Sequence, residues 1–299
     1  MLTGGVDEDW VYLSSSVLYP GGCSVPSMES SRDAHVTFLT QESPPRITIC
    51  GGYSGGSTKD CLVLRNGGWI GEELDDMPDK RYQSASARLD AGVFILGGSN
   101  AHTSSLLLRA NSNSWVEGPQ LPVAMRDGPC AAPISAHSFL IVYETHVYEF
   151  DTRVGGPTSS SGWKDKTTWP QLQVSRILGP GCAVVGNKFI VAGGRDAVKF
   201  GESLKSTEII DLRTRSITAG GGMEKPREFF HLLSISGTLY ALGGEYYDEE
   251  DDHYLADVEE FVEETGSWRP AESLPGERTQ FGAVAVNKDL VCGSESEYN

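Results

Sequence analysis

The stretch FILGGSN at residues 94–100 decides the fold, because an apolar run that favours a β-strand ends there on a double glycine. The same ending recurs in ITICGGYSG (47–55), FIVAGGRDA (189–197) and LYALGGEYY (239–247). Glycine reaches positive φ and allows close backbone approach, since it has no Cβ. The recurrence therefore indicates a repeated unit in which one strand ends at a tight turn.

A periodic arginine accompanies this ending. The intervals are 49, 45, 50, 51 and 51 residues between Arg32, Arg81, Arg126, Arg176, Arg227 and Arg278. Each arginine is followed by two short strands, a third strand and a place for tryptophan, with 17 residues from Gly98 to Trp115. Four strands in a unit of about 50 residues, without helical periodicity, predict an all-β propeller rather than a sandwich or a solenoid.

The order of Arg, Gly-Gly and Trp resembles the Kelch repeat over essentially the whole chain. The third and sixth repeats depart from it, because IVYE (141–144) and VCGS (291–294) stand where the double glycine is expected. The resemblance implies one six-bladed Kelch-type β-propeller spanning residues 1–299. We expect its blades at 32–69, 81–115, 126–169, 176–219, 227–268, and 278–293 together with 10–25.

Ring closure is predicted from the N-terminal sequence. SSVLYPGGC (15–23) aligns without gaps with CLVLRNGGW (61–69), with Cys23 at the tryptophan position. We therefore expect residues 10–25 to form the third and fourth strands of the last blade. The C-terminal segment would provide the first two strands, leaving only short or covered edges.

The charge pattern excludes some classes of partner. The formal net charge is −17, and residues 244–264 contain 11 acidic residues and no lysine or arginine. Such a charge argues against nucleic acid and anionic membranes as partners, and no apolar run is long enough to span a bilayer. We expect a monomer that binds a protein or an acidic peptide.

The arginines begin the innermost strands and should therefore meet at one mouth of the channel. Two interpretations remain open: they pair within the ring, leaving recognition to the loops, or they offer bidentate bonds to acidic groups. In Kelch domains of cullin-ligase substrate adaptors, arginines at the matching position help hold acidic degron peptides. The resemblance therefore implies a peptide-binding mouth, lined also by His35, Tyr82, Phe229, Phe230, His231, Gln280 and Phe281.

An alternative function comes from the acidic segment at 245–260. Plant Kelch specifier proteins, which act on glucosinolate breakdown products with iron, carry a Glu-x3-Asp-x3-His motif after a Gly-Gly. Glu245, Glu249 and His253 have that spacing, with glutamate replacing aspartate. Carboxylate and imidazole suit Fe²⁺, and clustered carboxylates suit Ca²⁺. No other catalytic motif is present, so we favour a non-enzymatic scaffold without a cofactor.

The six cysteines divide by position. Cys50 and Cys61 end and begin neighbouring strands, so a disulfide between them is geometrically reasonable. Cys130 and Cys182 fall on innermost strands as buried thiols, and we expect Cys23 and Cys292 to be unpaired. A Cys50–Cys61 bridge would favour an extracellular setting, as in secreted invertebrate Kelch proteins, over a cytoplasmic one.

Overall fold

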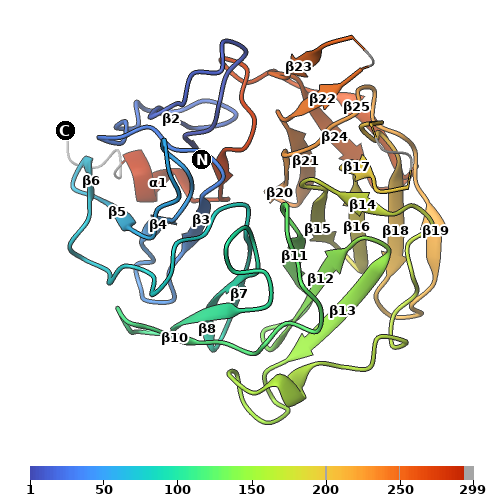
Figure 1. Cartoon of the computed structure of the whole chain (residues 1–299). Coiled ribbons are helices and arrows are strands. Elements are labelled where there is room, and N and C mark those ends of the chain that lie inside the picture. The colour runs from blue at the N-terminus through green and yellow to red at the C-terminus, as the bar shows by residue number, and fades with distance from the viewer. Residues whose placement is uncertain (199–200, 249, 293–299) are drawn as a thin grey trace.

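Six antiparallel sheets surround a central channel in the computed structural model, which describes residues 1–198, 201–248 and 250–292 (Figure 1). Four of these blades have four strands each, running outward from the channel in chain order. Blade 1 consists of β3 (Val36–Leu39), β4 (Ile47–Cys50), β5 (Cys61–Arg65) and β6 (Gly68–Ile70). Blade 2 consists of β7 (Ala85–Leu89), β8 (Gly92–Leu96), β9 (Ser105–Arg109) and β10 (Trp115–Glu117). Blade 4 consists of β15 (Gly181–Val185), β16 (Lys188–Ala192), β18 (Thr207–Asp211) and β19 (Ile217–Ala219). Blade 5 consists of β20 (His231–Ile235), β21 (Thr238–Leu242), β24 (Val258–Val262) and β25 (Ser267–Pro270).

The other two blades have three strands each in the described residues. Blade 3 consists of β11 (Cys130–Pro133), β12 (Ser138–Tyr143) and β13 (His146–Asp151), with a 3₁₀ turn, η1 (Ser160–Gly162), beyond them. Blade 6 consists of β26 (Gly282–Ala283), β1 (Leu2–Thr3) and β2 (Ser16–Val17). Two small hairpins complete the strands: β14 (Arg176–Ile177) with β17 (Arg195–Asp196), and β22 (Glu245–Tyr247) with β23 (Asp252–Tyr254). The six-bladed all-β prediction is confirmed.

Blade 6 closes the ring with N-terminal strands, as predicted, but the division of strands differs. β1 pairs with both β26 and β2, so the N-terminus supplies the second and third strands. The predicted division of two C-terminal and two N-terminal strands is therefore wrong. Gly4 and Gly5 are the double glycine of this blade, and residues 288–292 form helix α1 (Lys288–Cys292) instead of a strand. The apolar run preceding Gly4 is too short for the repeat pattern to reveal it.

The blades are joined around the channel by a closed ring of backbone hydrogen bonds. Each blade donates one N–H, at the start of its innermost strand, to a carbonyl of the blade before it, with N···O distances of 2.5–3.2 Å. The six donor and acceptor pairs are Gln83–Ala34, Gly128–Gln83, Gly179–Asp127, Phe229–Gly179, Gln280–Phe229 and Ala34–Gln280. The last pair returns to blade 1, so the ring has no free end.

Apolar side chains fill the spaces between neighbouring blades. Phe94 of blade 2 packs against Phe139 and Phe150 of blade 3, with ring centroids 5.5 and 5.8 Å apart. The repeat tryptophans add a polar clamp: the indole N–H of Trp115 donates to Asp75 O at 2.8 Å, in the segment between blades 1 and 2. The indole N–H of Trp163 donates in the same way to Gln120 O at 2.8 Å, in the segment between blades 2 and 3. Trp69 of blade 1 donates likewise to Pro26 O at 3.0 Å, so the recurring tryptophan fixes blades 1, 2 and 3 to the connection that precedes each of them.

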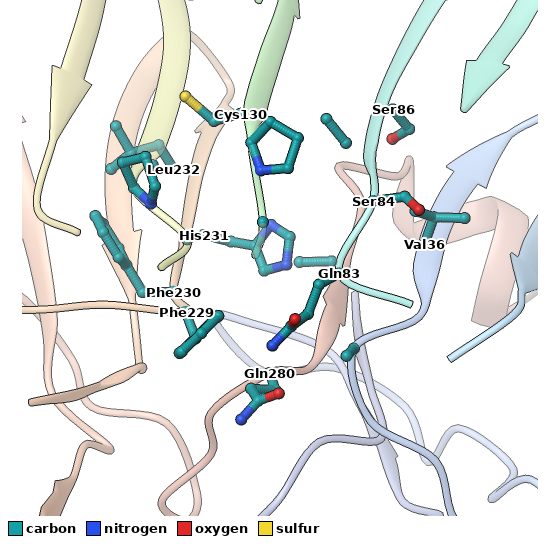
Figure 2. Close-up of a pocket in the computed structure, with 18 of the residues that line it drawn as sticks. Val36, Gln83, Ser84, Ser86, Cys130, Phe229, Phe230, His231, Leu232 and Gln280 are labelled. Atoms are coloured by element: carbon teal, nitrogen blue, oxygen red, sulfur yellow. The ribbon is translucent and has the colours of Figure 1, made fainter. Parts of the chain in front are cut away.

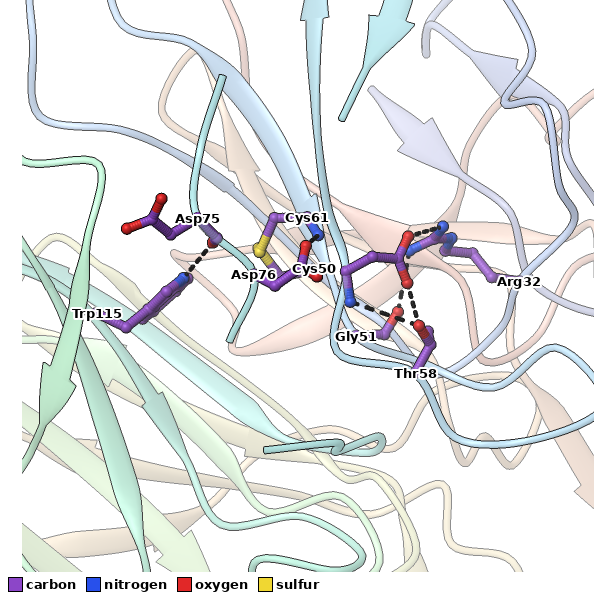
Figure 3. The surroundings of a disulfide bond; sticks show 9 residues. Arg32, Cys50, Gly51, Thr58, Cys61, Asp75, Asp76 and Trp115 are labelled. Atoms are coloured by element: carbon purple, nitrogen blue, oxygen red, sulfur yellow. Dashed lines mark hydrogen bonds and ion pairs between the residues drawn. A yellow bond between two sulfur atoms is a disulfide. The ribbon is translucent and has the colours of Figure 1, made fainter. Parts of the chain in front are cut away.

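All six cysteines form disulfides. The predicted Cys50–Cys61 bond is confirmed, and it joins residues directly opposite on β4 and β5, with Cα atoms 4.2 Å apart (Figure 3). The expectation of free thiols at the other four positions is wrong. Cys130 on β11 pairs with Cys182 on β15, because neighbouring innermost strands lie side by side. Cys23 pairs with Cys292, because α1 folds back on the N-terminal segment.

Candidate functional site

The connections that follow the second strands gather around one mouth of the channel, and we call this set of loops the crown. They begin at or beside the double glycines, on the face where the innermost strands start. Blade 3 contributes only a tight turn at Glu144. The crown loops lie at 4–15, 51–60, 97–104, 143–146, 193–206 and 243–257, apart from residues 199, 200 and 249, which are outside the described residues. Loops on a rigid frame are where recognition residues concentrate.

Five of the predicted arginines do not line the mouth, because their side chains are buried. Each donates through Nη1 to the carbonyl of the first glycine of a double glycine: Arg32 to Gly51, Arg81 to Gly97, Arg176 to Gly193, Arg227 to Gly243 and Arg278 to Gly4. In four of them Nη2 also meets a carboxylate: Asp60, Asp79, Glu208 and Glu259. Nη2 of Arg32, which is labelled in Figure 3 beside Gly51, donates to Asp60 Oδ2 at 2.6 Å. The arginine-rimmed mouth is therefore wrong, and internal pairing is the interpretation that holds.

The sixth arginine, Arg126, is exposed because it stands one residue beyond the repeat position. Met125 occupies that position: it is fully buried, and its carbonyl accepts the N–H of Gly98, as the Arg81 carbonyl accepts that of Gly52. Blade 3 has no double glycine, so no glycine carbonyl there needs a guanidinium donor. Because five of the six guanidinium groups are buried, the described residues offer no ring of exposed arginines that could bind an acidic peptide at the mouth.

The channel opens at the crown into a cavity of about 220 Å³ lined by all six innermost strands. Of the aromatic and polar residues expected there, all but Tyr82 line it: His35, Phe229, Phe230, His231, Gln280 and Phe281. Figure 2 shows Phe229, Gln83 and Gln280 near one another at one end of the pocket. Burial lowers the pKa of both His35 and His231, so both imidazoles are neutral at physiological pH. The cavity is therefore an uncharged pocket with amide groups at its mouth.

Exposed apolar side chains concentrate on the crown. Among the described residues, seven large apolar side chains are exposed, and five of them lie on crown loops: Trp10, Val11, Tyr12, Val198 and Tyr247. Trp10 is 66% exposed and Val198 83%. Sequence analysis missed the first three because Gly4-Gly5 was not recognised as the double glycine of blade 6. An alignment of the residues that follow each double glycine would have placed 6–15 among the crown loops.

The crown aromatics also contact one another across blades. Tyr12 of the blade 6 loop packs against Tyr53 of blade 1 at 6.2 Å between ring centroids, and Tyr53 packs against Tyr82 of blade 2 at 5.8 Å. On the other side, Trp10 meets Tyr254 of the blade 5 loop edge-on at 5.8 Å. These contacts make an aromatic arc over blades 5, 6, 1 and 2.

Two comparisons, taken together with the six-bladed fold, bear on the family. A family model described as the Kelch motif matches residues 176–216, which is most of blade 4. The chain is a Kelch-repeat β-propeller. Kelch-like protein 33 of Homo sapiens is 28% identical to this Kelch propeller over 138 residues, covering 44% of this chain and 25% of the relative. The match thus spans a quarter of that protein's length. The family and the fold together support a protein-interaction scaffold.

The predicted metal ligands do not converge in the Kelch propeller. On the β22–β23 hairpin Glu245 pairs with Tyr254, and Tyr246 pairs with His253. Directly paired side chains share a face and neighbours alternate, so Glu245 and His253 lie on opposite faces. Glu249 is outside the described residues, within which no group of three His, Cys, Asp or Glu side chains is placed to hold a metal. Glu245 and His253 are therefore not brought together, and binding of iron or calcium by the acidic loop stays a prediction.

Glu245 and His253 have separate partners in this Kelch propeller. Burial, followed by the nearby Glu228 carboxylate, raises the pKa of Glu245 to about 7. Nε2 of His253 donates a hydrogen bond to Asp248 Oδ2 at 2.7 Å, and its ring stacks on Tyr246 at 4.6 Å between centroids. Both interactions stabilise the crown hairpin. In the part of the Kelch propeller that is described, no helix combines the length and apolar character needed to cross a bilayer.

Proposed function

We propose that the protein is a non-catalytic interaction module that docks a protein or peptide partner on the crown and the channel mouth. The observation that carries the proposal is the concentration of exposed apolar side chains on these loops. Tryptophan and tyrosine dominate the binding energy of protein interfaces. The neutral cavity beneath them is large enough to take a projecting side chain of the partner.

The rigidity of the frame supports this function. The buried arginines bond both ends of five of the six crown loops, as Arg176 does with Gly193 and Ser206, and the hydrogen-bonded ring holds the innermost strands together. A preorganised surface loses little conformational entropy when a partner binds. The relative's membership of a Kelch-like family supports the same class of function.

The test is a peptide-display selection on the immobilised protein, followed by affinity measurements on the enriched peptides. We expect Trp10→Ser to weaken binding by about tenfold or more, because it removes the most exposed crown aromatic. The matched control is Val154→Ser, which removes an exposed apolar side chain that follows β13 on the opposite face. Equal affinities for the two variants would contradict the crown as the docking surface.

A further inference from the structure

We propose that the crown binds a cationic segment of its partner, with one lysine or arginine side chain held at Asp33 among Tyr12, Tyr53 and Tyr82. This inference rests on the proposed function, because it names the partner chemistry of the same surface. It reverses the sign of the partner charge expected from the sequence. Three independent features of the described residues lead to it.

The first feature is a buried carboxylate without a cation. Asp33 is only 7% exposed, and its Oδ1 has no hydrogen-bond partner. A buried, unsatisfied carboxylate is costly unless a charge or donor meets it. Burial accordingly raises the pKa of Asp33 to about 6. At neutral pH the group is still mostly ionised, and it attracts a positive charge.

Comparison with blade 5 shows what Asp33 lacks. Glu228 is its counterpart, since each directly follows a buried repeat arginine and pairs through the backbone with the residue after the double glycine. The Glu228 carboxylate forms an ion pair with Arg195, which follows the double glycine of the preceding blade. For Asp33 the preceding blade is blade 6, and the residue that follows its double glycine is Val6, which is buried and apolar. The blade 6–blade 1 junction therefore has the acid without its arginine.

The second feature is the aromatic group above this carboxylate. Tyr12, Tyr53 and Tyr82 form a continuous cluster, and Tyr12 is partly exposed. Asp33 pairs through the backbone with Tyr53, whose ring packs against Tyr12, so the carboxylate belongs to the same cluster. Burial and then the Asp33 carboxylate raise the pKa of Tyr12. Aromatic faces attract ammonium and guanidinium groups. A carboxylate beside tyrosine rings is the combination that binds an alkylammonium or a guanidinium.

The third feature is the charge of the neighbouring loops. Residues 1–31 contain four acidic residues and no lysine or arginine, and 244–264 contain 11 acidic residues and none either. At the seam between them, burial and then the Glu8 carboxylate raise the pKa of Glu277. Carboxylates crowded in this way repel an acidic partner and attract a basic one.

The experiment uses three fluorescein-labelled dodecapeptides with the repeats Lys-Leu-Gly, Glu-Leu-Gly and Ser-Leu-Gly. Their binding to the full chain is followed by fluorescence anisotropy at physiological ionic strength. We expect the lysine peptide to bind, and the glutamate and serine peptides to bind at least about tenfold more weakly.

Two matched variants locate the interaction. Asp33→Asn should weaken binding of the lysine peptide by about fivefold or more. The control is Asp90→Asn, the same change at an exposed turn between β7 and β8 on the opposite face, and it should change the affinity by less than about twofold. Tyr12→Leu should weaken binding as well, and Tyr12→Phe should restore it, since only the aromatic ring is required.

Equal losses in Asp33→Asn and Asp90→Asn would overturn the inference, because they would show non-specific attraction to the net charge. Failure of the wild type to bind the lysine peptide, or equal binding of the glutamate peptide, would also overturn it. Peptides from the display selection that depend on Trp10 but are neutral or acidic would refute the cationic partner and leave the docking surface intact. If binding of these peptides did not depend on Trp10 either, both the cationic partner and the crown as docking surface would be refuted.

Discussion

The buried repeat arginine is a structural residue that fastens the end of the second strand. Arg227 is fully buried, and it donates to the carbonyls of Gly243 and Asp257 at 2.8 Å and to Glu259 at 2.9 Å. These bonds satisfy backbone carbonyls that the sheet ladder leaves free. A cation in this position is therefore required by the loop geometry, whatever the partner of the protein is.

Replacing this arginine should be costly. Arg227→Met should lower the free energy of unfolding by about 3–5 kcal/mol, since Glu259 would be left as an uncompensated buried charge. Arg126→Met, at the exposed neighbour of Met125, should change it by less than about 0.5 kcal/mol. Urea denaturation measures both. Similar values for the two variants would show that the buried bonds contribute little.

The sequence predicted the position of these arginines but not the direction of their side chains. Their spacing follows from the repeat, whereas their burial depends on a glycine carbonyl many residues later in the chain. The same limit explains the shift at Arg126, because the residue type matched the pattern where the backbone did not. Asp33 could not be recognised at all, since its significance lies in the residue it fails to meet.

At the scale of the strands and turns, the double glycine is a requirement of close packing between blades. Gly244 has φ +97°, and a Cβ there would lie 2.6 Å from the Cβ of Phe230. Its N–H donates to the carbonyl of Arg278 in the next blade at 2.9 Å. The turn therefore needs both a positive φ and the absence of a side chain.

The two requirements can be separated by substitution. Gly244→Ala should cost about 3 kcal/mol or more, because it adds a steric clash to an unfavourable φ. Gly237→Ala, in the turn between β20 and β21, should cost only about 1 kcal/mol, since φ is +86° but the space is open. Thermal denaturation compares them, and equal costs would mean that the clash relaxes.

Strands and turns were the most predictable elements. The apolar runs and the double glycines identify blades 1, 2, 4 and 5, and the tryptophan adds to this signal in blades 1, 2 and 5, because these signals are local in the sequence. Blade 6 was harder, since its strands β1 and β26 have two residues each and come from opposite ends of the chain. The hairpin β22–β23 was read as a metal-binding loop because a spacing motif carries no information about which face a side chain occupies.

For the whole molecule, the closure of the ring combines β-pairing with a covalent bond. β1 lies between β26 and β2, and the Cys23–Cys292 disulfide joins residues 269 positions apart. Crosslinks between distant residues restrict the unfolded chain more than short-range ones do. The N-terminal and C-terminal segments, seen on the same side of the ring in Figure 1, are therefore held together twice.

Removal of this bond should loosen one blade. Cys23→Ala with Cys292→Ala should lower the free energy of unfolding by about 3–5 kcal/mol. Hydrogen exchange should accelerate in residues 1–25 and 278–292, because their strands are the shortest in the ring, and should stay unchanged in blade 3. Uniform acceleration throughout the propeller would show that closure is not local.

The ring of hydrogen bonds at the mouth has a consequence for how proteins of this architecture can diversify. Six backbone hydrogen bonds, one donated by each blade, hold the rim, and none of them involves a side chain. The residues near them are as different as Ala34, Gln83, Asp127, Leu178, Phe229 and Gln280, all with φ between +49° and +55°. Substitutions here can therefore change the chemistry offered to a partner without altering the frame, which makes the rim a natural set of positions for altering specificity.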